Sequence, residues 1–210
     1  RHAAWFHWTA ATPALHPDGS TVTREVVEAA TRKGMTISTD LNYRSKLWQY
    51  GKKPADVMPE LVQYCDVVMG NIWAANNMLG TGLDTAALEK DEKSIYLQQA
   101  EQVAGEITSK YTRCKQVAFT FRFSHAPSHN LYYAFYYNAG RVSVSRQYDT
   151  SEVIDRVGSG DCFMAGLIHA RLQGLDDQQV ISFAAAAAYS KFFVRGDFNT
   201  TSAEEIIKLI

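Results

Sequence analysis

The sequence of 210 residues contains few cysteines, and none of them are closely spaced. Cys65, Cys114 and Cys162 are far apart, and no Cys-x-x-Cys pair occurs. Disulfide-stabilised domains and zinc sites both need closely grouped cysteines, so neither is expected here. The cysteine usage therefore predicts a protein of the reducing cytoplasm.

The sequence also lacks an excess of charge of either sign and a long apolar run. It has 21 basic and 22 acidic residues, with a formal net charge of −1. Nucleic-acid binders and membrane-surface binders usually carry a basic excess, so neither function is expected. The most apolar stretch, residues 180–194, contains Ser182, Ser190 and Lys191 and is too short to span a membrane.

Segments with strand character alternate with segments of helical periodicity along most of the chain. The predicted strands are residues 3–10, 35–40, 65–69 and 116–121, followed by a hairpin of residues 131–137 and 142–147 with a loop of three or four residues. The predicted helices are residues 21–32, 54–64, 72–79, 93–111, 162–173 and 177–193, and a last helix follows Ser202. Pro13 and residues 17–19 predict a loop. This alternation predicts a three-layer α/β sandwich with a largely parallel sheet and an antiparallel hairpin toward one edge.

The aromatic hairpin allows two interpretations. Five aromatic residues could form a stacking platform for nucleic acid, namely Tyr132, Tyr133, Phe135, Tyr136 and Tyr137. Aromatic residues are, however, simply favoured in strands. Basic partners are sparse here, so strand packing is the favoured interpretation.

A glycine turn leads directly into a predicted helix near residue 160. Gly158, Ser159 and Gly160 precede Asp161, after which apolar residues recur at helical spacing. The start of a helix presents unpaired backbone N–H groups, so this turn can hold a phosphate. Asp161 beside such a site can serve as a base for phosphoryl transfer, or it can be only a carboxylate that stabilises the first helical turn.

Polar residues also follow several predicted strands. They are Asp40 to Arg44, Asn71 and Thr120. Ligands of open α/β sheets bind at the carboxyl ends of the strands, so these residues and Asp161 are predicted to share a single cleft.

The segment Asp155-Arg156-Val157-Gly158-Ser159-Gly160-Asp161-Cys162-Phe163-Met164-Ala165-Gly166 resembles the C-terminal signature of the ribokinase-like (PfkB) carbohydrate kinases. Every fixed position of that signature is present. The resemblance implies a ribokinase-like fold, an anion hole formed by Gly158, Ser159 and Gly160, and Asp161 as the catalytic base. It also assigns Asp155, which opens the segment, to the substrate side.

Four further stretches resemble the 2-keto-3-deoxygluconate kinases within that family. They are residues 5–15, residues 40–48, Ser128-His129-Asn130 and Gly196-Asp197-Phe198-Asn199. This resemblance covers nearly the whole chain and implies that Arg44 binds the carboxylate of a sugar acid, for which a guanidinium offers bidentate hydrogen bonds. Alternatively Arg44 forms a structural ion pair with Asp40 or another acid. Asn42 serves the same cleft or holds the loop.

The resemblance implies ATP and Mg²⁺ as the nucleotide and metal. It places Asn71 and Thr120 near the triphosphate and Asn199 near the adenine end, and Arg122 within reach of phosphate. No residue is assigned as a metal ligand, because Ala74 stands where many members of the family have a glutamate. The phosphates are therefore expected to hold most of the Mg²⁺. Lys191 lines the adenine pocket or extends to solvent, and the second alternative is favoured.

The start of the chain, in the aromatic segment Trp5-Phe6-His7-Trp8, resembles the middle of a family member. We therefore expect residues 1–210 to be the C-terminal two-thirds of one kinase domain, without the part that contributes a lid, part of the sugar pocket and often a homo-oligomer contact. A chain without that lid is expected to be a weak catalyst, because water would reach the reacting groups. Two alternatives remain open. One is a kinase for a neutral sugar or nucleoside, of the fructokinase or ribokinase type, and the other is a non-catalytic nucleotide-binding module.

Overall fold

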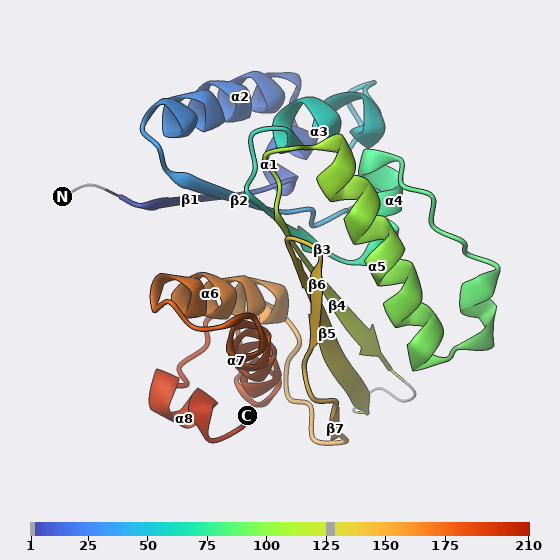
Figure 1. Ribbon diagram of the computed structural model, residues 1–210, viewed down its shortest axis with the longest axis vertical. Coiled ribbons are helices and arrows are strands. Elements are labelled where there is room, and N and C mark those ends of the chain that lie inside the picture. Colours follow the sequence, from blue (N-terminus) through green and yellow to red (C-terminus); the bar gives the residue numbers. More distant parts are fainter. Residues whose placement is uncertain (1–2, 125–128) are drawn as a thin grey trace. The chain divides into compact units, whose positions relative to one another are not determined.

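The computed structural model describes residues 3–124 and 129–210, and Figure 1 shows their helices and strands. The chain divides into two compact units. Unit 1 comprises Arg1–Phe119 and Tyr137–Gly140, and unit 2 comprises Thr120–Tyr136 and Arg141–Ile210. Strands β4 (Gln116–Phe123) and β5 (Asn130–Asn138) contribute residues to both units.

Unit 1 is built on parallel strands. They are β1 (Trp5–Thr9), β2 (Thr36–Asp40), β3 (Val67–Gly70) and the beginning of β4. In the register of the sheet, Asp40 lies opposite Thr9 on one side and Met69 on the other. The carboxyl ends of these strands therefore lie at one edge of the sheet in unit 1, as the sequence predicted.

The helices of unit 1 bury their apolar faces in the core of this unit. They are α1 (Ala11–Leu15), α2 (Pro17–Arg32), α3 (Pro54–Val62), α4 (Ile72–Leu79) and α5 (Lys93–Lys110), with a short 3₁₀ helix η1 (Ala87–Lys90). Ile37, Val67 and Val68 of the strands and Met58 and Leu61 of α3 are fully buried. Burial of such side chains stabilises a fold by about 1.5–3 kcal/mol each, so this core is the main stabilising contribution in the unit.

The predicted loop at residues 13–19 is wrong. Residues 11–15 form α1, and α2 begins at Pro17, before either of the two caps that the sequence suggests, Thr21 and Thr23. Proline is favoured in the first turn of a helix, where its missing N–H costs nothing, and the His16 side chain caps the helix by accepting a hydrogen bond from the Asp18 N–H. The expected end of α2 is confirmed, with Gly34 at φ 67° just beyond it.

Unit 2 combines antiparallel strands with four helical segments. Its further elements are β6 (Arg141–Val144), β7 (Tyr148–Thr150), α6 (Ser159–Leu172), α7 (Asp177–Ser190), the 3₁₀ helix η2 (Lys191–Phe193) and α8 (Ala203–Ile207). Strand β7, which the sequence did not predict, pairs with β5 in antiparallel register. The hydrogen-bonded strand order of the seven-stranded sheet is β1-β2-β3-β4-β5-β6, with β7 beside β5.

Helices α6 and α7 pack closely against each other because the residues at their contact are small (Figure 1). A Cβ atom on Gly166 would lie 3.0 Å from the Ala184 Cα and 3.0 Å from the Ala187 Cβ. The run of alanines in α7 is buried, as expected from the sequence. The start of α6 is therefore anchored on a rigid helix pair.

The aromatic side chains of β5 pack within unit 2. Tyr132, Tyr133, Phe135 and Tyr136 are all buried, and the ring of Tyr133 stacks on Phe121 with 4.9 Å between centroids. This confirms strand packing for these four side chains, while Tyr137, the fifth of the predicted set, is half-buried. The loop between β5 and β6 is shorter than predicted, since only Ala139 and Gly140, both at positive φ, separate the strands.

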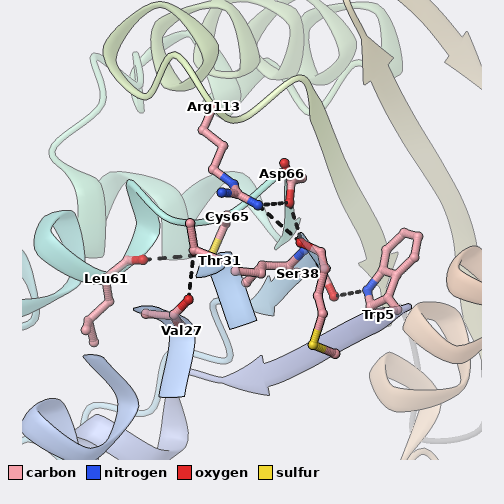
Figure 2. A network of polar contacts seen from close by, with 10 residues as sticks. Trp5, Val27, Thr31, Ser38, Leu61, Cys65, Asp66 and Arg113 are labelled. Atoms are coloured by element: carbon pink, nitrogen blue, oxygen red, sulfur yellow. Dashed lines mark hydrogen bonds and ion pairs between the residues drawn. The ribbon is translucent and has the colours of Figure 1, made fainter. Parts of the chain in front are cut away.

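A polar network ties the strands of unit 1 to the chain segment before β4 (Figure 2). The Asp66 carboxylate accepts hydrogen bonds from the Ile37 N–H at 2.8 Å and from the Arg113 guanidinium at 2.9 Å. Arg113 also donates to the Met35 carbonyl at 3.2 Å. One half-buried carboxylate thus connects β2 to the turn that precedes β4.

None of the described helices is both long enough and apolar enough to cross a membrane.

We expect Asp66→Ala to destabilise the protein by about 2 kcal/mol, because the substitution removes an acceptor of two hydrogen bonds and leaves Arg113 without its carboxylate. Urea denaturation measures the free energy of unfolding. Glu25→Ala, at an exposed position of α2, is the control and should change it by less than about 0.5 kcal/mol. Equal effects of the two substitutions would contradict this role of Asp66.

Candidate active site

The residues that follow β2 form a tight loop in unit 1. The Asn42 N–H donates to Asp40 Oδ1 at 2.9 Å, and the Asn42 side-chain amide donates to the Thr9 hydroxyl at 3.2 Å. Asn42 also has a positive φ of 28°. These contacts agree with the loop-holding alternative for Asn42, and its binding of substrate stays a prediction.

Arg44 lies two residues farther along and is exposed. Among the described residues, no carboxylate lies within ion-pair distance of its guanidinium, so the alternative of a structural pair with Asp40 finds no support. An exposed guanidinium at the carboxyl edge of the sheet is available to a carboxylate ligand.

Asn71 follows β3 and caps α4. Its side-chain oxygen accepts a hydrogen bond from the Ala74 N–H at 2.8 Å. Because Asp40 lies opposite Met69 in the parallel pair of β2 and β3, Asn42 and Asn71 follow neighbouring strand ends. Unit 1 therefore brings two of the predicted site residues, and Arg44 after them, to one edge of its sheet.

The start of α6 in unit 2 has the geometry of an anion site. Gly158 caps the helix in the left-handed conformation with φ 76°, and Asp161 lies exposed in the first turn. Within the part of the chain that the structure describes, the N–H groups of Gly160 and Asp161 donate to no backbone carbonyl. Free N–H groups at the positive end of a helix are what a phosphate group requires.

Gly158 lies against the loop that follows η2. A Cβ atom at Gly158 would lie 2.4 Å from the Asp197 carbonyl oxygen. Any larger residue would clash with that oxygen unless the backbone moved. Sequence reasoning missed this close approach, because Asp197 is separated from Gly158 along the chain and nothing in the residue pattern links them.

The Asp155 carboxylate holds the same two segments together. Its Oδ1 accepts from the Val157 N–H at 3.0 Å and its Oδ2 from the Gly196 N–H at 2.8 Å. These backbone hydrogen bonds hold the pKa of Asp155 below its ordinary value. Both oxygens thus have structural partners, and the assignment of Asp155 to the substrate stays a prediction.

Asn199 lies close to the end of α7. Its side-chain amide donates to the Ser190 hydroxyl at 2.8 Å and to the Ala187 carbonyl at 3.3 Å, and its oxygen accepts from the Thr201 N–H. A contact of Asn199 with adenine therefore stays a prediction. The favoured interpretation of Lys191 is wrong, since its side chain is 0% exposed and does not reach solvent.

Thr120 and Arg122 lie on β4 within unit 2, Thr120 half-buried and Arg122 exposed. Their predicted contacts with the triphosphate are not tested by these positions. Ser128 lies outside the described residues, while the His129 Nε2 lies 2.7 Å from Asp149 Oδ1. Since Arg44, Asn42 and Asn71 belong to unit 1 and the other predicted residues to unit 2, the single cleft stays a prediction.

The donor set for a metal ion is sparse. Ala74 is buried in α4, and the described residues contain no group of three or more histidine, cysteine or acidic side chains that could hold a metal. The residues present fit a nucleotide phosphate at the start of α6, and they fit a magnesium ion only if phosphate oxygens supply most of its ligands.

Comparisons with known proteins show similarity over nearly the whole chain. The chain is 27% identical over 211 residues to a 2-dehydro-3-deoxygalactonokinase of Haloferax volcanii. The aligned region covers 99% of this chain and 57% of that protein. The chain is 34% identical to the 2-dehydro-3-deoxygluconokinase of Thermotoga maritima, whose crystal structure matches 99% of this chain with a TM-score of 0.87 and of which this chain covers 60%. The chain thus spans less than two-thirds of the length of these relatives.

A more distant structure is that of the fructokinase of Xylella fastidiosa with bound ATP, at 20% identity and a TM-score of 0.67, covering 99% of this chain and 61% of that one. These superpositions confirm the predicted ribokinase-like α/β fold with a mostly parallel sheet. The family model of the pfkB carbohydrate kinases matches residues 3–201, and the chain belongs to this family.

Proposed function

We propose that this chain carries the phosphoryl-transfer site of an ATP-dependent sugar kinase. Its substrate is 2-keto-3-deoxygluconate or a similar sugar acid, phosphorylated on the terminal hydroxyl. The observation that carries the proposal is the start of α6, where an exposed carboxylate, Asp161, lies in the first turn of a helix with free N–H groups. The relatives named for 2-dehydro-3-deoxy sugar acids support the choice of substrate class.

Asp161 acts as the general base in this proposal. Its carboxylate takes the proton of the terminal hydroxyl as that oxygen forms a bond to the γ-phosphorus, while the bond to the bridging oxygen of ATP breaks and ADP leaves. Asp161 is exposed in this structure, so a substrate hydroxyl can approach it.

The backbone around Gly158 stabilises the transferred group. The Ser159 N–H, part of the predicted anion hole, already donates to the Arg156 carbonyl at 3.4 Å. In this proposal the N–H groups of Gly160 and Asp161 therefore donate to the phosphoryl oxygens, on which negative charge is spread in the transition state. These donors are held in place before the reaction because Gly158 is fixed by the Asp197 carbonyl and α6 is packed on α7.

Arg44 binds the substrate carboxylate. A guanidinium forms two parallel hydrogen bonds with a carboxylate, whereas a neutral sugar offers no group of that geometry. The absence of an ion pair at Arg44 among the described residues supports this role. Asn42 serves the substrate on the same edge of unit 1. The nucleotide is served by Asn71, Thr120, Arg122 and Asn199.

Magnesium bound to ATP neutralises phosphate charge when present. The crystal structure of a ribokinase-like neighbour from E. coli, 20% identical to this chain, contains ATP and Mg²⁺. At that identity the bound ligands are a property of that protein alone. All three cysteines of this chain are free thiols, and together with the use of ATP this supports a cytoplasmic enzyme.

Asp161→Asn should lower kcat by about 10²–10⁴-fold, since the amide cannot accept the hydroxyl proton. The Kd for ATP, measured by calorimetry, should change little because the backbone N–H groups remain. Glu152→Gln, at an exposed position of the preceding loop, is the matched control and should leave kcat unchanged. Loss of ATP binding together with turnover in Asp161→Asn would contradict the role of a base.

Arg44→Ala should raise KM for the sugar acid by about 10–100-fold, the value of a charge-assisted bidentate pair, with little change for fructose or ribose. Lys46→Ala, which removes an exposed charge from the same loop, is the control and should leave KM within about twofold. A loss confined to neutral sugars would instead favour a kinase of the fructokinase or ribokinase type.

Gly158→Ala should weaken ATP binding and destabilise the protein, because it adds a Cβ both at positive φ and against the Asp197 carbonyl. Gly174→Ala is the matched control, since Gly174 has a similar φ of 72° but no atom within 4 Å of the added Cβ. The control should lower stability by about 1 kcal/mol without changing the Kd for ATP. Equal Kd values in both variants would show that the close approach at Gly158 does not matter for binding.

A further inference from the structure

Lys191 is a fully buried cation close to the proposed phosphate site. It begins η2 directly after α7, and its side chain is 0% exposed. The ammonium group donates to the Val194 carbonyl oxygen at 2.6 Å. Among the described residues, no carboxylate lies within ion-pair distance of it. Burial of an unpaired ammonium is costly, so its presence in the interior requires a compensating interaction.

The segment that carries Lys191 is hydrogen-bonded to the residues that precede the glycine turn. In η2, the Phe192 carbonyl accepts hydrogen bonds from the N–H groups of Ile154 at 2.8 Å and Asp155 at 3.2 Å. Val194, the acceptor of the ammonium, leads to Gly196, whose N–H donates to the Asp155 carboxylate. Lys191 therefore fixes the beginning of the loop that lies against Gly158.

The charge of Lys191 also acts on groups that flank the turn. It contributes to the lowering of the Asp155 pKa, and at Cys162 it opposes the rise in pKa that burial of the thiol causes. Asp155 precedes the turn and Cys162 lies in the first turn of α6. The charge of Lys191 thus acts on one group before the turn and on one group in the first turn of α6.

We propose that Lys191 is a positioning residue for phosphate binding: a buried cation that holds the 194–197 loop against Gly158 and favours negative charge at the start of α6. The inference rests on the proposed function of that turn as the site of the phosphoryl group. Because its side chain is buried, Lys191 acts through the backbone and through its charge, and does not touch the ligand. In the protein alone no carboxylate in the described part of the chain pairs with the ammonium, and a bound phosphate supplies the negative charge that it interacts with.

The test compares a charged and an uncharged ligand. The Kd values for ATP and for adenosine are measured by calorimetry on this chain and on Lys191→Met and Lys191→Gln. Removal of one buried unit charge near a bound phosphate, in a medium of effective dielectric constant about 20, is expected to weaken the affinity by roughly tenfold. Both variants should therefore bind ATP about tenfold more weakly, while their Kd for adenosine stays within about twofold. Lys208→Met removes an exposed lysine of unit 2 and should change neither value.

Each outcome distinguishes the two proposals. If the unmodified chain binds ATP and Lys191→Gln binds it equally well, the inference about Lys191 is overturned while the proposed function stands. Equal weakening for ATP and adenosine would also overturn it, because a purely structural role would affect both ligands. If the unmodified chain binds no ATP, the proposed function itself fails, and the inference with it.

Lys191→Gln keeps a hydrogen-bond donor and provides the comparison should Lys191→Met not fold.

A second readout is independent of nucleotide. Loss of the positive charge should raise the Cys162 pKa and slow its alkylation by iodoacetamide near neutral pH, while the buried Cys65 and Cys114 report any unfolding. An unchanged rate at Cys162 in a folded variant would contradict an effect of the charge.

Discussion

The contact between Gly158 and the Asp197 carbonyl is the constraint on which the proposed site in unit 2 depends. It requires a glycine, because a Cβ at this position would lie 2.4 Å from the carbonyl oxygen. Around it, the Asp155 carboxylate accepts a hydrogen bond from the Gly196 N–H, which joins two segments distant in sequence, and Lys191 donates to Val194 within the second of them. The turn at Gly158 and the packing of α6 on α7 together position the start of α6. The free N–H groups are thus fixed before any ligand binds, which is the condition for electrostatic stabilisation of a transferred phosphoryl group.

Much of the fold could be predicted from the sequence because its signals are local. The apolar run of β3, the helical periodicity of α5 and the position of Ser202 before the last helix all act within a few residues, and the structure confirms these elements. The beginning of α2 could not be read in the same way. Pro17 and Gly19 are typical of loops, but proline is also favoured in a first helical turn, and the cap comes from His16, a residue that is not a usual N-cap.

The site was only partly predictable. The signature from Asp155 to Gly166 located the helix start and Asp161, since glycines at fixed spacing have a direct backbone meaning. The partners that hold this turn could not be found, because the contacts of Asp197, Gly196 and Lys191 depend on tertiary structure. Lys191 did carry one signal, a lysine that follows a run of alanines and precedes two phenylalanines. An apolar neighbourhood of that kind indicates burial rather than extension to solvent.

The central claim is that this chain, alone or within a longer polypeptide that contains it, transfers phosphate from ATP to a sugar acid. The most direct measurement is ATP-dependent phosphorylation of 2-keto-3-deoxygluconate, 2-keto-3-deoxygalactonate, gluconate, fructose, ribose and adenosine under identical conditions. We expect turnover of the keto-deoxy acids alone. Activity confined to fructose, ribose or adenosine would contradict the sugar-acid assignment and the role of Arg44. ATP binding without turnover of any substrate, by a longer polypeptide that includes the lid, would contradict catalysis by Asp161.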